Sequence, residues 1–224
     1  MGRTPSEIHV EAVFVVPDDP VAAYARWQRL EEILARAKAR REANLRDAYE
    51  AQSALDAQSP EPPLITDPRS LIADFITVAR LAGHTIAADE VGYDCLPAPH
   101  SPPTRLPTGM LVTYAFACGK TCLIVGKAVP KTHAWYTKLH YRSTSANTSL
   151  ARSMLKYARS ESSTDEAAAG LVAIWRGLND ETVGDWLQTH ATRYHFFLDA
   201  TKPSALLLLL EAFLQCRLSP LLIV

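Results

Sequence analysis

The chain has 224 residues, 48% of them hydrophobic, which suits one domain with an appendage or two small domains and supplies a core. Its 23 basic and 24 acidic residues leave a net charge of −1, so the chain as a whole is not a basic protein. The four cysteines have no zinc-like spacing, and the N-terminus lacks the basic and then apolar run of a signal peptide. Glu211, Arg217 and Pro220 interrupt the apolar C-terminal segment, which argues against a spanning helix. We therefore expect a cytoplasmic protein with no membrane partner.

The first 58 residues are expected to form a short strand over residues 8–16 and then a long helical arm over residues 21–58. Pro17 stops the strand, and Pro20 lies in the first turn of the helix. The apolar stripe of this helix is broken between Leu34 and Leu45, where basic residues dominate. Three interpretations stay open: an arm that crosses a DNA backbone, a helical hairpin, or a helix through which two copies of the chain associate.

Proline-rich segments divide the middle of the chain. Residues 59–66 are expected to form a linker, because their prolines fix an extended path. Residues 67–108 are expected to hold a helix capped by Asp67 and ended by Gly83, followed by an irregular lead-in. The remaining residues, 109–224, are expected to form the main domain.

That domain opens with two apolar runs, residues 110–118 and 121–125, which are joined at Gly119-Lys120 and predict a hairpin. A third strand is expected over residues 193–198, where aromatic residues alternate. Helices are expected over residues 132–140, 149–159, 167–178, 181–191 and 204–218, the last one buried against the sheet. The predicted class is α+β: a small three-stranded mixed or antiparallel sheet flanked by helices, with an N-terminal helical region.

Charge is distributed unevenly along the chain. Between Cys95 and Ser160 there is no acidic residue and there are nine basic ones, which leaves 14 basic against 24 acidic residues elsewhere. Such a block indicates a polyanionic partner, most plausibly nucleic acid, and a simply solvated basic face is the alternative. The candidate nucleic-acid contacts in or next to the hairpin and the helix that follows it are Lys131, Lys138, Tyr141, Arg142, Arg152 and Lys156.

Four segments of this region resemble the GIY-YIG nuclease superfamily, in particular its small bacterial members. They are residues 125–131 (VGKAVPK), 139–141 (LHY), 149–155 (SLARSML) and 209–218 (LLEAFLQCRL), in the family's order. The resemblance covers about half of the chain, from Gly109 to Pro220. It implies a GIY-YIG-like fold with a small three-stranded sheet, and a DNA endonuclease that needs a divalent cation.

Glu211 is the central candidate for that chemistry. It is the one charged residue in an apolar segment, where an ionised and unpaired carboxylate is costly. It should therefore lie at the helix edge, pair with a base or bind a cation, and oxygen ligands of this kind suit Mg²⁺ or Mn²⁺. A place on the solvent side of the helix is the alternative. The resemblance favours the metal, because Glu211 matches the family's metal-binding glutamate.

The resemblance also assigns the other catalytic candidates. Tyr114 matches the first motif tyrosine, which is implicated in activating the attacking water, and Lys127 is a candidate cation for lowering the pKa of its phenol. His140 matches a histidine that serves as a proton shuttle or phosphate ligand. We expect this histidine to stay out of the apolar core, because Lys138 and Arg142 flank it.

The chain departs from the family pattern at three places. The first motif glycine is replaced by Val112, the second motif tyrosine by Ile124, and the catalytic arginine by Trp135. A tryptophan cannot stabilise transition-state charge as a guanidinium does.

The sequence as a whole predicts a metal-dependent endonuclease that hydrolyses DNA phosphodiester bonds. The alternatives are a catalytically impaired nucleic-acid-binding module of the same fold and a helical interaction protein.

Overall fold

The computed structural model describes residues 20–57, 64–144, 149–160 and 168–222. The chain divides into two compact units, residues 1–43 and residues 44–224. Helix α1 (Pro20–Ala57) confirms the predicted long helix and begins in the first unit. The strand expected over residues 8–16 and most of the predicted linker lie outside the described residues.

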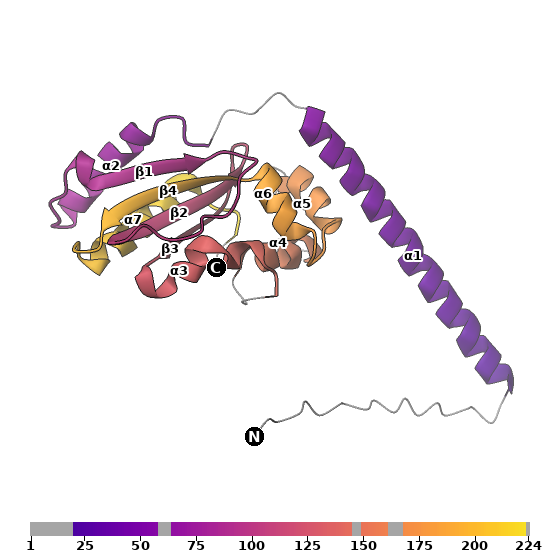
Figure 1. The fold of residues 1–224 in the computed structure, drawn as a ribbon. Helices are drawn as coiled ribbons and strands as arrows, with labels where there is room; N and C mark the ends of the chain where they lie inside the picture. Colours follow the sequence, from indigo (N-terminus) through magenta and orange to yellow (C-terminus); the bar gives the residue numbers. More distant parts are fainter. Residues whose placement is uncertain (1–19, 58–63, 145–148, 161–167, 223–224) are drawn as a thin grey trace, which may run out of the picture. The chain divides into compact units, whose positions relative to one another are not determined.

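A four-stranded antiparallel sheet forms the centre of the second unit (Figure 1). Its strands are β1 (Val91–Leu96), β2 (Met110–Cys118), β3 (Thr121–Ala128) and β4 (Thr192–Asp199), in the order β1-β4-β2-β3. The hairpin and the strand near residues 193–198 confirm their predictions, but the prediction of three strands is wrong. The fourth strand, β1, contains Gly92 and Asp94, which weaken the strand signal. It pairs only with β4, at the edge of the sheet.

The β2–β3 hairpin turns at two residues, because Cys118 pairs with Thr121. Gly119 has a φ of +55°, which a type II′ turn requires at its first central position. Strand β2 is buried along nearly its whole length, since β4 and β3 flank it and helices cover both faces of the sheet. This double burial explains its almost continuous apolar sequence.

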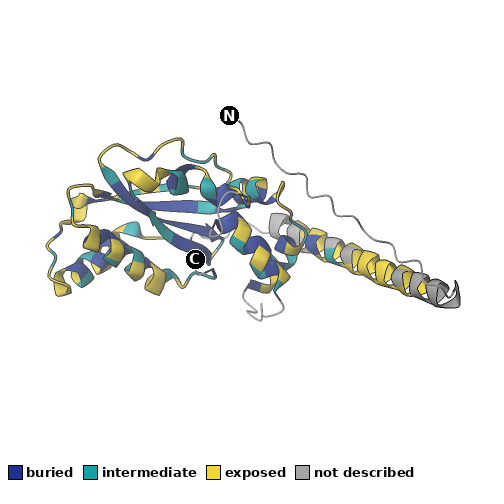
Figure 2. Ribbon diagram, turned by 90° about the horizontal axis from the view of Figure 1, so that it is seen from below, coloured by how far each residue is buried: buried dark blue, intermediate teal, exposed yellow. Residues whose placement is uncertain are grey.

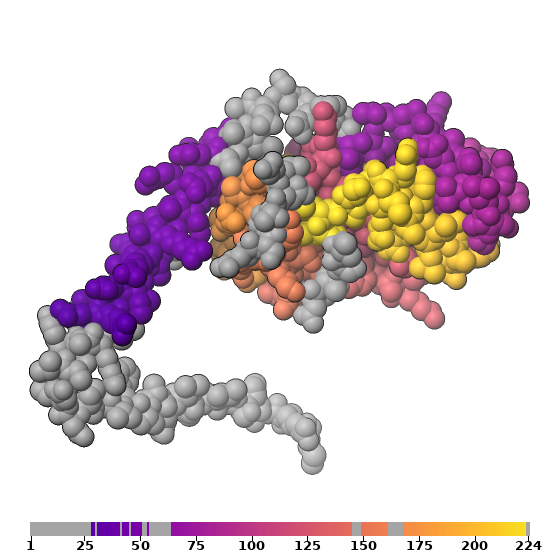
Figure 3. Space-filling view, turned by 180° about the vertical axis from the view of Figure 1, so that it is seen from behind, coloured from indigo at the N-terminus to yellow at the C-terminus, as the bar shows by residue number. Residues whose placement is uncertain are grey.

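Helices form a layer on each face of the sheet. One layer contains α2 (Pro68–Leu81) and α7 (Ser204–Leu218), which contact each other and lie side by side in Figure 3. The other layer contains the short helix α3 (His133–Thr137), then α4 (Leu150–Arg159), α5 (Ala169–Arg176) and α6 (Val183–His190). Three 3₁₀ turns complete the described elements: η1 (Ala88–Glu90), η2 (Pro130–Thr132) and η3 (Leu139–Tyr141).

Each layer closes its own hydrophobic core, and Figure 2 shows the buried strands between helices with exposed outer faces. Phe75 of α2 and Leu210 of α7 pack with Phe196 on one face. Met154 of α4 and Trp175 of α5 pack with the opposite face. Because α2 and β1 contribute to these cores, the segment expected as a helix and lead-in is part of the same fold as the predicted main domain.

The segment after α7 lies along the outer edge of β3. The backbone amides of Leu221 and Leu222 donate hydrogen bonds of 2.9 and 3.0 Å to the carbonyl oxygens of Cys122 and Leu123. Leu222 is buried in the core on the α4 side. These contacts explain why this segment is apolar, and they cover one end of an edge strand.

No helix within the described residues is long and apolar enough to cross a membrane.

Candidate active site

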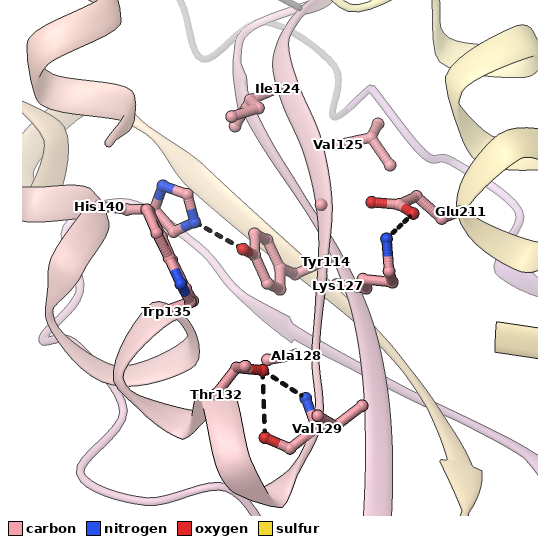
Figure 4. A pocket seen from close by; sticks show the side chains of 11 residues that line it. Tyr114, Ile124, Val125, Lys127, Ala128, Val129, Thr132, Trp135, His140 and Glu211 are labelled. Atoms are coloured by element: carbon pink, nitrogen blue, oxygen red, sulfur yellow. Dashed lines mark hydrogen bonds and ion pairs between the residues drawn. The ribbon is translucent and has the colours of Figure 1, made fainter. Parts of the chain in front are cut away.

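A pocket of about 410 Å³ surrounds the second half of strand β3 (Figure 4). The four predicted catalytic residues all line it: Tyr114 from β2, Lys127 from β3, His140 from η3 and Glu211 from α7. The other lining residues are Ile124, Val125, Gly126, Ala128, Val129, Thr132 and Trp135. Figure 4 shows two polar pairs on opposite sides of β3, Tyr114 with His140 and Lys127 with Glu211. Residues up to 97 positions apart in the sequence are thus brought to one pocket.

Tyr114 and His140 form the first pair. The Tyr114 hydroxyl lies 2.6 Å from His140 Nε2, and both side chains are buried. His140 Nδ1 accepts a 3.2 Å hydrogen bond from the backbone amide of Leu150, the first residue of α4. The ring is thus held from both sides, by the sheet and by the start of a helix. Our expectation that His140 stays out of the apolar core is wrong, because it is only 3% exposed.

These contacts assign the protons of the pair. Since Nδ1 accepts the Leu150 amide, the neutral imidazole carries its proton on Nε2, and that proton points at the Tyr114 oxygen. Tyr114 then accepts from His140 and keeps its own hydroxyl proton for a second partner. Among the described residues no other group hydrogen-bonds to this hydroxyl, so the proton is available to a molecule in the pocket.

Gly126 makes room for this arrangement. It lies directly opposite Tyr114 in the β2–β3 ladder, and a Cβ atom built on it would be 2.9 Å from the tyrosine oxygen and 3.0 Å from two ring carbons. A larger residue at 126 would therefore displace the phenol ring. The absence of a side chain at position 126 therefore has a structural reason, which is the close approach of Tyr114.

Burial sets the protonation of both groups. It raises the pKa of Tyr114 above its usual value, and the Arg193 guanidinium only partly opposes this. Burial, together with Arg193, lowers the pKa of His140 to about 3. At neutral pH the pair is therefore a protonated phenol beside a neutral imidazole. The expectation that Lys127 would lower the pKa of Tyr114 is wrong, because Lys127 lies on the other side of β3 and pairs with Glu211 (Figure 4).

Lys127 and Glu211 form the second pair. Lys127 Nζ donates to Glu211 Oε2 at 2.5 Å, and the two side chains are 37% and 16% exposed. Glu211 follows Leu207 by one turn of α7 and lies beside the buried stripe of Leu206, Leu210 and Leu214. Glu211 therefore lies at the helix edge and pairs with a base, which are two of the three arrangements expected for it from the sequence.

Trp135, which the predicted resemblance aligns with a catalytic arginine, forms part of the pocket wall. It is half-buried, and its ring centroid lies 5.4 Å from that of His140. The expected helix over residues 132–140 is in fact two 3₁₀ turns and the five-residue α3. These turns place Trp135 and His140 against the same pocket, while Lys131 and Lys138 are exposed.

The remaining predicted nucleic-acid contacts fall in different places. Arg142 is exposed, and Arg152 and Lys156 line a separate pocket on α4. Tyr141 is not a surface residue: it is 8% exposed, and its hydroxyl lies 2.7 Å from His100 Nε2. It belongs to the core beneath α6 and is not placed for contact with nucleic acid.

The sequence analysis missed Arg193, which is fully buried beside the site. Its guanidinium lies 4.7 to 5.2 Å from the ring centroids of Tyr136, Phe116 and Tyr114, and it donates to the Tyr136 carbonyl oxygen at 2.6 Å. No carboxylate pairs with it among the described residues, and its Nε has no partner. The sequence held one signal for this residue: side chains alternate along β4, which places Arg193 and His195 on the same face as Phe197.

Glu211 is the residue that could hold a divalent cation. It is the only carboxylate that lines the pocket, and no group of three or more metal-ligating side chains occurs in the described parts of the chain. Mg²⁺ commonly takes one or two carboxylates and fills its other positions with water and substrate phosphate. These donors fit such an open site if Glu211 leaves its ion pair with Lys127 and binds the cation instead.

Comparisons with known proteins find no matching family model, no matching curated protein and no matching solved structure.

Proposed function

We propose that the chain is a metal-dependent endonuclease of the GIY-YIG type, which hydrolyses DNA phosphodiester bonds in the pocket at β3. The observation that carries the proposal is that Tyr114, Lys127, His140 and Glu211 line one pocket although they come from four separate elements. The basic block between Cys95 and Ser160 supports a polyanionic substrate.

The protein's own groups have complementary roles in this reaction. Tyr114 directs its hydroxyl proton at a phosphoryl oxygen, because His140 already donates to the phenol oxygen. Its raised pKa makes it a hydrogen-bond donor rather than the base for the attacking water. Glu211 would hold the divalent cation, and Lys127, released from its ion pair with Glu211, would contact the phosphate. A bound divalent cation supplies neutralisation of phosphate charge and a lower pKa for water.

Cleavage of supercoiled and branched DNA with Mg²⁺ or Mn²⁺ tests the proposal. Glu211→Gln should lower the rate by a factor of about 100 or more, as for loss of a principal electrostatic group. Glu90→Gln is the matched control, because Glu90 also pairs with a lysine, Lys202, but lies outside the pocket. Equal cleavage by the wild type and Glu211→Gln would contradict the proposal.

A second candidate is a binding module of the same fold that no longer cleaves. Two observations favour it: the single pocket carboxylate is neutralised by Lys127, and Trp135 stands where the family has a cation. Activity that is absent in the wild type and present in Trp135→Arg would identify a decayed nuclease. Absence of cleavage in both, with salt-sensitive DNA binding, would establish the binding module.

A further inference from the structure

A second pocket, which we call the α4 pocket, has a volume of about 660 Å³ and shares no lining residue with the active-site pocket. It is lined by Ser143, Thr144, Arg152, Leu155, Lys156, Arg159, Ser160 and Asp180. Its floor is the buried Leu155, and its cations come from the exposed face of α4. Nothing in the proposed chemistry of the active-site pocket uses these residues.

Three cations converge on this pocket. Arg152, Lys156 and Arg159 follow one another at intervals of four and three residues, which places them on one face of the helix. None of them forms an ion pair with the described residues, although Asp180 lines the same pocket. Like charges held this close on one helix face are mildly destabilising, so the arrangement favours an external anion.

Ser143 provides an independent indication. Its residue is only 4% exposed, and its Oγ is buried without a hydrogen-bond partner among the described residues. An unsatisfied buried hydroxyl is costly, and this one belongs to a residue that lines the α4 pocket. Because the Oγ atom is closed to solvent, a rotation of the Ser143 side chain toward the pocket would bring its proton to an anionic oxygen that also faces the cations.

We propose that the α4 pocket binds a backbone phosphate of the nucleic acid, outside the bond that is cleaved. The phosphate oxygens contact Arg152, Lys156 and Arg159 and accept a hydrogen bond from Ser143. The identity of the anion as nucleic acid rests on the proposed function, whereas the anion site itself rests on the pocket, its cations and the buried hydroxyl.

Helix α4 connects this pocket to the active site. Its first residue, Leu150, donates to His140, and Lys156 and Arg159 follow six and nine residues later. At 1.5 Å per residue they lie about 9 and about 14 Å farther along the helix axis. One strand of B-form DNA rises about 3.4 Å per phosphate along the duplex axis, so with α4 parallel to that axis the offset would correspond to about three or four phosphates. The α4 pocket therefore sets the register of the strand rather than the chemistry.

The test is the affinity of the full chain for a short labelled duplex, measured by fluorescence anisotropy over a salt series without divalent metal. Arg152→Gln/Lys156→Gln should reduce the magnitude of the slope of log affinity against log salt by up to about 0.9, the value for one phosphate contact. Arg69→Gln/Arg80→Gln is the matched control, because it removes the same charge from exposed positions of α2 on the other face of the sheet. It should leave the slope nearly unchanged.

Two single variants test whether the α4 pocket attracts an anion. Ser143→Ala should weaken binding about tenfold without changing the salt slope, since it removes a hydrogen bond to a charged group but no charge. Asp180→Asn should strengthen binding, because it removes a carboxylate from an anion site. Weaker binding in Asp180→Asn, or equal slopes for the two double variants, would overturn the proposal.

Cleavage assays on the same variants separate this inference from the proposed function. A wild type that cleaves, with a double α4 variant that binds as the wild type does, overturns the α4 site and leaves the nuclease in place. Binding that depends on the α4 pocket, without cleavage under Mg²⁺ or Mn²⁺, supports the α4 site and contradicts the nuclease.

Discussion

The two sides of strand β3 contain polar pairs of opposite character. On one side, Tyr114 and His140 are buried, uncharged and held by Leu150 and the surrounding aromatic rings. On the other side, Lys127 and Glu211 are charged and partly exposed, and they hold only each other among the described residues. The first pair is fixed by its surroundings, whereas the second would, in the proposed function, exchange partners with a cation and a phosphate.

In the proposed function, this difference would give the two pairs different roles. A fixed donor gains nothing from mobility, because its use lies in orientation. A carboxylate and an ammonium that hold each other must separate to act, so their pairing has to be weak enough to break. Measurements of stability can test this division without any knowledge of the substrate.

The largest expected effect is a loss of folding stability in acid, which comes from two buried histidines. His140 and His195 have pKa values lowered to about 3 and about 2 by burial, with Arg193 contributing to both. In the unfolded chain they titrate near 6.5, so stability is complete above that pH and is lost as the pH falls below it. Between about pH 6.5 and about pH 5 each should cost about 1.6 kcal/mol. Denaturant unfolding at the two pH values measures the loss.

His195→Phe supplies the control for that prediction. Neither ring nitrogen of His195 has a hydrogen-bond partner among the described residues, and its Nδ1 lies 3.6 Å from Asp94. Phenylalanine removes the titration and two unsatisfied atoms, so about half of the acid effect should disappear. An acid sensitivity equal to that of the wild type would contradict the assignment.

The next effect concerns the contact between Gly126 and Tyr114. Gly126→Ala should cost about 2 kcal/mol, because the new Cβ would push against the tyrosine ring where it is held by His140. Gly170→Ala in α5 is the matched change, since no atom lies within 4 Å of a Cβ built there. It should be neutral or stabilising by about 0.5–1 kcal/mol. Thermal unfolding of the two variants should shift in opposite directions.

A smaller effect is expected from Tyr114→Phe, which leaves the His140 Nε2–H without its partner. The loss should be about 1–2 kcal/mol and should not depend on salt, because both groups are buried and neutral. Urea unfolding at low and high ionic strength measures both properties. A strong salt dependence would mean that the pair carries charge.

The smallest effect belongs to the exposed side. Lys127→Met/Glu211→Gln should cost less than about 1 kcal/mol, because it removes a partly exposed ion pair without leaving the Glu211 carboxylate unpaired, and the cost should shrink further with salt. A loss larger than that of Tyr114→Phe would reverse the comparison between the two sides of β3. Lys202→Met/Glu90→Gln is the control for removal of another partly exposed ion pair.

Local patterns predicted much of the fold. The hairpin follows from two apolar runs around Gly119, and α7 begins and ends at the predicted residues, 204 and 218. Strand β1 was not predicted, because its pairing with β4 compensates for a sequence with weak strand propensity.

The site was predicted in its members but not in its pairings. Glu211 stood out as the one charge in an apolar segment, yet its partner Lys127 lies 84 residues away. The burial of His140 and Arg193 depends on rings from several elements that meet only in the folded chain. Flanking charges along the sequence, such as Lys138, therefore gave the wrong expectation for His140.

The two hydrogen bonds from Leu221 and Leu222 to β3 have a practical consequence for handling this protein. They occupy backbone carbonyls that would otherwise be open to a strand from another molecule. Removing residues 219–224 should leave the pocket at β3 intact, because none of its lining residues belongs to this segment. It should instead make the protein self-associate, which light scattering would record as a rise with protein concentration. An affinity tag or fluorophore attached next to these residues should therefore affect solubility more than activity.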